Sequence, residues 1–166
     1  MAVQRYWSER DGNPLIDQPT GTEKSVVIAN LVERSAVLGR RVLVLSHSRE
    51  IIDQDRKAIL QSWPDAPIGI NSDALGERNT EAPIVLATVQ SVFRKPEALG
   101  HRDYILVDEA HLVPHGDDGM YHAVFNALRE INPKLRVAGF TATPYRLDSG
   151  RLDEGDNRLF DETVIT

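Results

Sequence analysis

The strongest constraint on the fold is an alternation of short apolar runs with longer amphipathic segments. Each run is four to six residues long and rich in Val, Ile and Leu. Such composition is typical of strands that are buried on both faces of a sheet. The runs cover residues 14–17, 41–46, 67–70, 84–87, 104–107 and 136–140.

Amphipathic segments of helical period lie between most of these runs, at 24–38, 50–63 and 120–131. Gly39 follows the first segment and Asn132-Pro133 closes the third, as helix ends require. The alternation predicts an α/β domain whose mostly parallel sheet has about six or seven strands, with helices on both faces. We expect residues 147–162 to form an exposed polar segment and 162–166 to begin another strand.

Composition excludes several classes of protein. The 166 residues are 41% apolar and 27% charged, which is ordinary for a globular domain. The chain has no cysteine, so disulfides and thiolate metal sites are excluded. It also lacks an apolar run of roughly 18 residues and a signal pattern, which predicts a cytoplasmic protein without membrane contact. A net charge of −6 argues against a generic nucleic-acid coat, although a local groove can still be positive.

The run at 14–17 leads into an octet, residues 18–25, in the context that a phosphate-binding loop requires. A helix follows, so that backbone N–H groups and a helix N-terminus would face an anion. Lys24 would reach the β- and γ-phosphates of ATP, and the Ser25 hydroxyl would ligate Mg²⁺. The alternative is a Thr-Gly turn that caps an ordinary helix, and the octet alone does not separate the two.

Two residues depart from the strict glycine pattern of this loop, Gln18 and Glu23. Glu23 is the important one, because a glycine before the lysine allows free backbone geometry and adds no charge beside the phosphates. A carboxylate ~4 Å from one phosphate charge costs about 4 kcal/mol at an effective dielectric near 20. That cost is nearly a thousandfold in affinity unless the Glu23 side chain turns to solvent.

An acidic pair, Asp108-Glu109, follows the run at 104–107. Ligands of α/β sheets bind at the carboxyl ends of parallel strands, so Asp108 is placed to hold Mg²⁺ and Glu109 to polarise an attacking water. The alternative is two acids that cap the following turn. If the sheet is parallel, we expect Lys24 and Asp108 to converge at one edge although they are far apart in sequence.

The run at 136–140 also ends in polar residues, the segment Thr141-Ala142-Thr143-Pro144. Hydroxyl groups at this place can relay between a γ-phosphate site and a ligand on the far edge. The alternative is a plain exit from a strand into a turn.

In this order, the blocks 19–25, 108–111 and 141–144 resemble motifs I, II and III of superfamily 2 (DEAD/DEAH-type) helicases. Residues 42–50 look like motif Ia, and residues 87–92 look like the next motif that contacts the nucleic-acid strand. The Val-Asp-Glu-Ala-His spelling at 107–111 and the tail at 144–148 are most similar to the RadD-like and type III restriction-subunit branch. That branch includes DNA-repair and prophage-encoded helicases. The resemblance covers nearly the whole chain.

The resemblance implies roles for the matching residues. ATP would contact Pro19, Thr20, Gly21, Thr22, Glu23, Lys24 and Ser25, with Mg²⁺ at Ser25 and Asp108. Catalysis would use Lys24, Asp108 and Glu109, with Glu109 as the base. Coupling of hydrolysis to DNA movement would use His111, Thr141 and Thr143. The DNA strand would face His47, Arg49, Thr88, Gln90 and Ser91. Taken alone, His47 reads as a surface histidine at a helix start, and Gln90 and Ser91 as caps of the following helix.

Residues 1–166 are therefore expected to form the first RecA-like domain of a DNA-dependent ATPase or helicase, with ATP and Mg²⁺ as cofactors and single-stranded or forked DNA as partner. The resemblance also implies a second RecA-like domain, which the chain does not supply, and an adenine-reading glutamine that would precede Ala2-Val3. One alternative is a non-hydrolysing DNA-binding or scaffolding lobe, which Glu23 favours. Another is a P-loop kinase or metabolic enzyme, which leaves the blocks 108–111 and 141–144 without a role.

Overall fold

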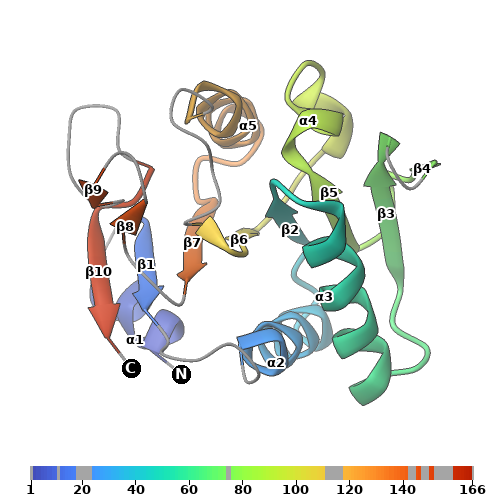
Figure 1. The fold of residues 1–166 in the computed structure, drawn as a ribbon, viewed down its shortest axis with the longest axis horizontal. Coiled ribbons are helices and arrows are strands. Elements are labelled where there is room, and N and C mark those ends of the chain that lie inside the picture. Colours follow the sequence, from blue (N-terminus) through green and yellow to red (C-terminus); the bar gives the residue numbers. More distant parts are fainter. Residues whose placement is uncertain are drawn as a thin grey trace.

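The fold is built on one large, twisted sheet (Figure 1). A computed structural model of the chain describes residues 2–10, 12–17, 24–73, 76–110, 118–141, 145–146, 150–151 and 159–165. Within these ranges the sheet has eight strands, in the order β10 (Glu162–Ile165), β1 (Pro14–Asp17), β7 (Arg136–Thr141), β6 (Tyr104–Val107), β2 (Val42–Ser46), β5 (Ile84–Thr88), β3 (Ile68–Ser72) and β4 (Glu77–Arg78).

All of these strands pair in parallel except β4, which runs antiparallel to β3. A separate hairpin joins β8 (Tyr145–Arg146) to β9 (Gly150–Arg151). The helices are α1 (Ala2–Glu9), α2 (Lys24–Val37), α3 (Arg49–Ser62), α4 (Val89–Val92), the 3₁₀ helix η2 (Pro96–Leu99) and α5 (Asp118–Ile131). No helix in the described ranges is long and apolar enough to cross a membrane.

The sequence prediction of a parallel α/β sheet is confirmed. Each of the six apolar runs forms a strand, and the three amphipathic segments form α2, α3 and α5 with ends that shift by two residues or fewer. The sheet is larger than the expected six or seven strands because the very short β4 and the C-terminal β10 extend its two ends. The sequence pattern gives no indication of α1 or η2, and it indicates α4 only as the helix that Gln90 and Ser91 were expected to cap.

Side-chain alternation along the strands supplies a core on each face of the sheet. In β2, Leu43 and Leu45 belong to the core under α4, η2 and α5, whereas Val42 and Val44 belong to the core under α1, α2 and α3. All four side chains are fully buried. Successive strand residues point to opposite faces, so a strand covered by helices on both sides must be apolar throughout. This explains why the runs in the sequence are continuous.

One expectation was wrong. The segment 147–162 does not lie wholly at the surface, because Leu159 and Phe160 are buried in the core shared with α5. The Phe160 ring fills the space beside Gly139 of β7, where an added Cβ would overlap the ring. An isolated apolar pair within a polar stretch has no periodicity that would reveal its burial.

Candidate functional site

Three charged side chains of the predicted site meet at the carboxyl edge of the sheet. Lys24 is the first residue of α2, and Asp108 and Glu109 follow β6. The Lys24 Nζ lies 3.2 Å from Asp108 Oδ1 and also forms an ion pair with Glu109. The expected convergence of Lys24 and Asp108 is therefore confirmed.

Two members of this cluster are buried, Lys24 at 3% exposed and Asp108 at 1%, whereas Glu109 is partly buried at 18%. Removing one partner of a buried pair leaves the other charge uncompensated, which typically costs about 3–5 kcal/mol. Lys24 and Asp108 can therefore both be buried at the sheet edge because their opposite charges compensate each other.

Backbone contacts hold Asp108 in place. Its N–H donates to the carbonyl of Leu45 at 2.9 Å, and the Ser46 hydroxyl donates to the Asp108 carbonyl at 3.3 Å. The end of β2 thus fixes the residue that follows β6. Neighbouring strands of a parallel sheet provide this support because their carboxyl ends lie side by side.

Glu109 has a backbone conformation that few non-glycine residues adopt, with φ at +50°. Its N–H donates to the Asp108 carboxylate at 2.8 Å. Along a regular strand, two consecutive side chains point to opposite faces. The left-handed turn breaks that alternation, and both acids reach the same ammonium. A strained backbone at this place is typical of functional sites.

Asp55 of α3 is a further acid at this site, and the sequence analysis missed it. It is fully buried, and it lies beside Asp108, Lys24 and Ser25. Burial, together with the Asp108 carboxylate, raises the pKa of Asp55 to about 10, while Lys24 and Ser25 act in the opposite direction. Neither oxygen of Asp55 makes a hydrogen bond of standard geometry to the described residues. The available signal was its position between Ile52 and Ile59, on the buried face of an amphipathic helix.

The oxygen groups at this edge fit Mg²⁺. The Ser25 hydroxyl and the Asp108 carboxylate are hard oxygen donors, which Mg²⁺ prefers over nitrogen or sulfur. Ser25 and Asp108 would hold the ion, as their sequence positions predict.

Of the other residues predicted for the nucleotide site, Thr141 belongs to the part of the chain that the structure describes. Thr141 ends β7, is fully buried, and pairs in register with Asp17 at the end of β1, so it lies at the same sheet edge. Several predicted residues lie outside the described ranges: Pro19, Thr20, Gly21, Thr22, Glu23, His111 and Thr143.

The five residues expected to face DNA come together in one recess of about 440 Å³. They are His47, Arg49, Thr88, Gln90 and Ser91, and they share the recess with Ser48, Glu50 and Asp73. The recess lies after the carboxyl ends of β2 and β5.

Some donors and acceptors of the residues that line the recess already form hydrogen bonds with one another. Gln90 Nε2 donates to the His47 carbonyl at 3.1 Å, and the Thr88 and Ser91 hydroxyls are 2.7 Å apart. The Ser91 hydroxyl also accepts the Asp73 N–H at 2.9 Å. No side-chain cap forms on the backbone at the start of α4, so the capping alternative for Ser91 is not what the structure shows.

Comparison with known proteins gives consistent results. The profile of a family described as "Type III restriction enzyme, res subunit" matches residues 1–146. A 51.5 kDa protein of a Lactococcus phage (isolate 7-9) is 30% identical over 151 residues, which are 90% of this chain and 28% of that protein. The chain therefore spans little more than a quarter of this relative.

Two solved helicase structures have the same fold. The UvsW helicase from bacteriophage T4 has a TM-score of 0.72 and 16% identity, over 93% of this chain and 54% of that one. The Hef helicase domain of Pyrococcus furiosus has a TM-score of 0.70 and 20% identity, over 100% of this chain and 40% of that one. These identities are low, so the likeness is one of fold. The family profile shows that the chain belongs to the type III restriction res-subunit family of superfamily 2 helicases, and the structural likeness shows that it has the fold of a RecA-like helicase domain.

Proposed function

We propose that this chain is the ATP-binding and ATP-hydrolysing lobe of a DNA-dependent ATPase or helicase. The observation that carries the proposal is the cluster of Lys24, Asp108 and Glu109 at the carboxyl edge of a parallel sheet. This cluster combines a cation for phosphates, an acid for a metal ion and an acid for a water molecule. In-line attack of water on a γ-phosphate needs all three.

The residues would act mainly by positioning and by charge. The Lys24 ammonium would exchange its two carboxylate partners for the β- and γ-phosphates of ATP. Glu109 would orient the attacking water and accept its proton. Mg²⁺, when bound at Ser25 and Asp108, neutralises charge that develops on the phosphates. The buried setting strengthens each of these interactions relative to water.

The recess formed by His47, Arg49, Thr88, Gln90 and Ser91 supports the DNA part of the proposal. Amide, hydroxyl and guanidinium groups are the usual donors to phosphate oxygens. Glu50 and Asp73 also line the recess, so the strand would be held by a few directed hydrogen bonds more than by net positive charge. A SWI2/SNF2 ATPase core of Sulfolobus solfataricus, solved in complex with dsDNA, has the same fold (TM-score 0.61, 18% identity, 86% of this chain and 30% of that one).

We further propose that a second RecA-like domain completes the ATP site in the intact protein. The chain covers 54% of the UvsW chain and 28% of the phage relative, which leaves room in those proteins for such a lobe. ATP would then bind between the lobes, and hydrolysis would open and close them on DNA.

Calorimetric titration of the chain with Mg-ATP tests the proposal. We expect binding in the wild type and in Glu109→Gln, and a loss of affinity of at least tenfold in Lys24→Ala. Where hydrolysis is measurable with single-stranded DNA present, Glu109→Gln should lower the rate by 10²-fold or more. Glu97→Gln, an exposed acid in η2, is the matched control and should change neither quantity. Absence of ATP binding with retained DNA binding would instead support the non-hydrolysing lobe that Glu23 favours.

A further inference from the structure

A second recess lies at the amino edge of the sheet, opposite the candidate nucleotide site. Its volume is about 880 Å³, and Tyr104 and Arg136, the first residues of β6 and β7, are part of its lining. Asp108 follows the other end of β6. Four residue steps along a strand span about 13 Å, so the two sites are separated by the depth of the sheet.

Positive charge gathers in this recess although the whole chain has a net charge of −6. Its lining includes Arg40, Arg129, Lys134 and Arg136, while Asp103 is the acid of the lining. The cations come from separate parts of the chain: the turn before β2, the end of α5, and the turn that leads into β7. The fold thus collects cationic side chains at one place.

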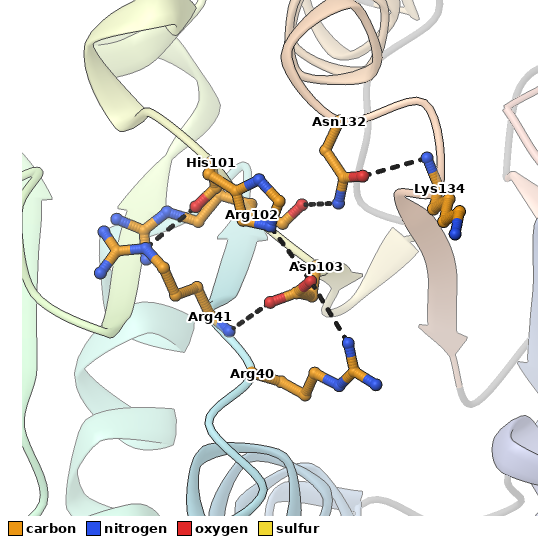
Figure 2. Close-up of polar contacts among 7 residues, drawn as sticks. All are labelled: Arg40, Arg41, His101, Arg102, Asp103, Asn132 and Lys134. Atoms are coloured by element: carbon orange, nitrogen blue, oxygen red, sulfur yellow. Dashed lines mark hydrogen bonds and ion pairs between the residues drawn. The ribbon is translucent and has the colours of Figure 1, made fainter.

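Buried and partly buried hydrogen bonds fix the walls of the recess (Figure 2). Asn132 donates to the Arg102 carbonyl at 2.9 Å and accepts the Lys134 N–H at 3.1 Å. Asp103 accepts the Arg41 N–H at 2.8 Å. Arg102 itself is fully buried and donates to the carbonyls of Thr80, Ala82, Pro83 and Leu99 at 2.7–3.1 Å. Because these groups are fixed by such bonds, the recess is formed before any ligand arrives.

The four cationic side chains of the recess differ in the hydrogen bonds and ion pairs that they already make. Arg129 donates to the Asn13 side chain at 2.7 Å, and Arg136 donates to the Arg10 carbonyl at 3.4 Å. Arg40 has a long ion pair with Asp103 at 3.8 Å. The Lys134 ammonium is exposed and makes no ion pair within the described ranges, and in Figure 2 only its backbone N–H is bonded. Lys134 and Arg40 are therefore the groups best able to meet a ligand.

We propose that this amino-edge recess binds a phosphate-bearing ligand, either a free nucleotide or the end of a nucleic-acid strand. Planar guanidinium groups pair with phosphate through two parallel hydrogen bonds, and a lysine adds a point charge. A volume of about 880 Å³ lies within the usual range for small-molecule sites, whereas an extended acidic peptide would need a longer groove. Tyr104 adds an aromatic side chain to the lining.

The recess also carries a built-in reporter. The Trp7 indole stacks on the Tyr104 ring at a centroid distance of 4.9 Å and an angle of 6°. The chain has two tryptophans, so a Trp63→Phe background leaves Trp7 alone. The emission of Trp7 then reports on the amino edge, and binding at the Lys24 site is followed separately through Mg-ATP calorimetry. Failure of one proposal is thus distinguishable from failure of the other.

The test titrates this background with inorganic tripolyphosphate, a 5′-phosphorylated single-stranded oligodeoxynucleotide and polyglutamate, without Mg²⁺. We expect Lys134→Glu to weaken the binding of a phosphate probe at least fivefold, and Lys134→Arg to stay within twofold of the wild type. Lys95→Glu makes the same charge change at an exposed lysine outside the recess and should also stay within twofold.

The outcomes decide both the site and the source of the phosphate. Tighter binding of the oligonucleotide supports a strand end, and comparable binding of tripolyphosphate alone supports a free nucleotide. Equal weakening by Lys134→Glu and Lys95→Glu overturns the proposal, because the interaction would then follow net charge. Stronger binding of polyglutamate than of either phosphate probe also overturns it, in favour of an acidic protein segment. The proposal is also overturned if the emission of Trp7 does not change with millimolar phosphate probes.

Discussion

At the scale of single residues, the Asp55 carboxyl group couples the ionisation of the site to the stability of the fold. Its pKa rises from an ordinary value of 3.8 to about 10, chiefly because the group is buried. Between these pH values the folded chain holds one more proton than the unfolded chain. The free energy of unfolding therefore falls as pH rises, by about 1 kcal/mol per pH unit for this group.

Replacing Asp55 by Asn should remove this pH dependence, because an amide keeps the shape of a protonated carboxyl and does not titrate. Relative to the wild type, Asp55→Asn should gain stability as pH rises from 5 to 8, by up to ~4 kcal/mol. Urea unfolding followed by circular dichroism at several pH values measures the difference.

Asp53→Asn is the matched control, since Asp53 lies on the same helix. The side-chain bond with Lys57 lowers the pKa of Asp53, so its contribution is lost only at acid pH. The control should run parallel to the wild type between pH 5 and 8. If Asp55→Asn also runs parallel, Asp55 is ionised in the folded chain and the assignment of its proton is wrong.

The sequence pattern alone predicts that a second residue, Glu23, affects the affinity for Mg-ATP. Glu23→Gly should tighten Mg-ATP binding, because it removes a negative charge beside the triphosphate and restores backbone freedom before Lys24. The gain could reach ~4 kcal/mol if the carboxylate faces the phosphates, and should then shrink as ionic strength rises. A small gain that does not change with salt would indicate repaired geometry alone. Equal affinities of the two proteins across a salt series would show that Glu23 is tolerated.

At the scale of elements, the sequence predicted most strands of the sheet but fewer of the helices around it. Strands buried on both faces have continuous apolar runs, and the parallel topology then places Lys24 and Asp108 at one edge. By contrast, α1 is short, and among its described side chains Val3 and Tyr6 are the buried apolar ones, which gives too few apolar positions to indicate a helix. Asp55 was missed because an acid within a helical pattern normally faces solvent. Its environment is set by α2 and β6, which are distant in sequence.

Close packing between β7 and the segment before β10 gives the element-scale prediction. An alanine at Gly139 would place its Cβ against the Phe160 ring and also 3.0 Å from Leu15. We expect Gly139→Ala to lower the free energy of unfolding by about 1–3 kcal/mol, as overpacked cores do. Combining it with Phe160→Leu should cost less than the sum of the single changes, because the two sites share one space.

Gly119→Ala in α5 provides the matched control for this substitution. A Cβ at Gly119 meets no atom within 4 Å, so an alanine there should be neutral or stabilise the helix by up to ~1 kcal/mol. Thermal and urea unfolding compare the variants. Equal effects of the two substitutions would contradict a specific contact between Gly139 and Phe160.

At the scale of the whole molecule, the two edges of the sheet differ in the charged side chains that they carry. The carboxyl edge holds buried acids around Lys24, together with the recess that contains Gln90 and Ser91. The amino edge holds the cationic recess around Lys134. Parallel strands produce this division because all their carboxyl ends lie together and all their amino ends lie together. Ligands at the two edges would therefore bind without displacing each other.

If a second RecA-like domain completes the ATP site, as proposed above, one domain alone should not separate DNA strands. Residues 1–166 have the fold of one RecA-like domain, which on this proposal would form one wall of an ATP cleft and one part of a DNA track. Closure of two lobes around ATP has no counterpart within a single lobe. We expect the purified chain to show no measurable strand separation on forked DNA in a fluorescence assay with Mg-ATP, even where it binds ATP. Lys24→Ala, which should lose ATP binding, is the control for ATP-independent melting. Strand separation by the wild type but not by Lys24→Ala would contradict the need for a second lobe, since one lobe would then convert hydrolysis into movement.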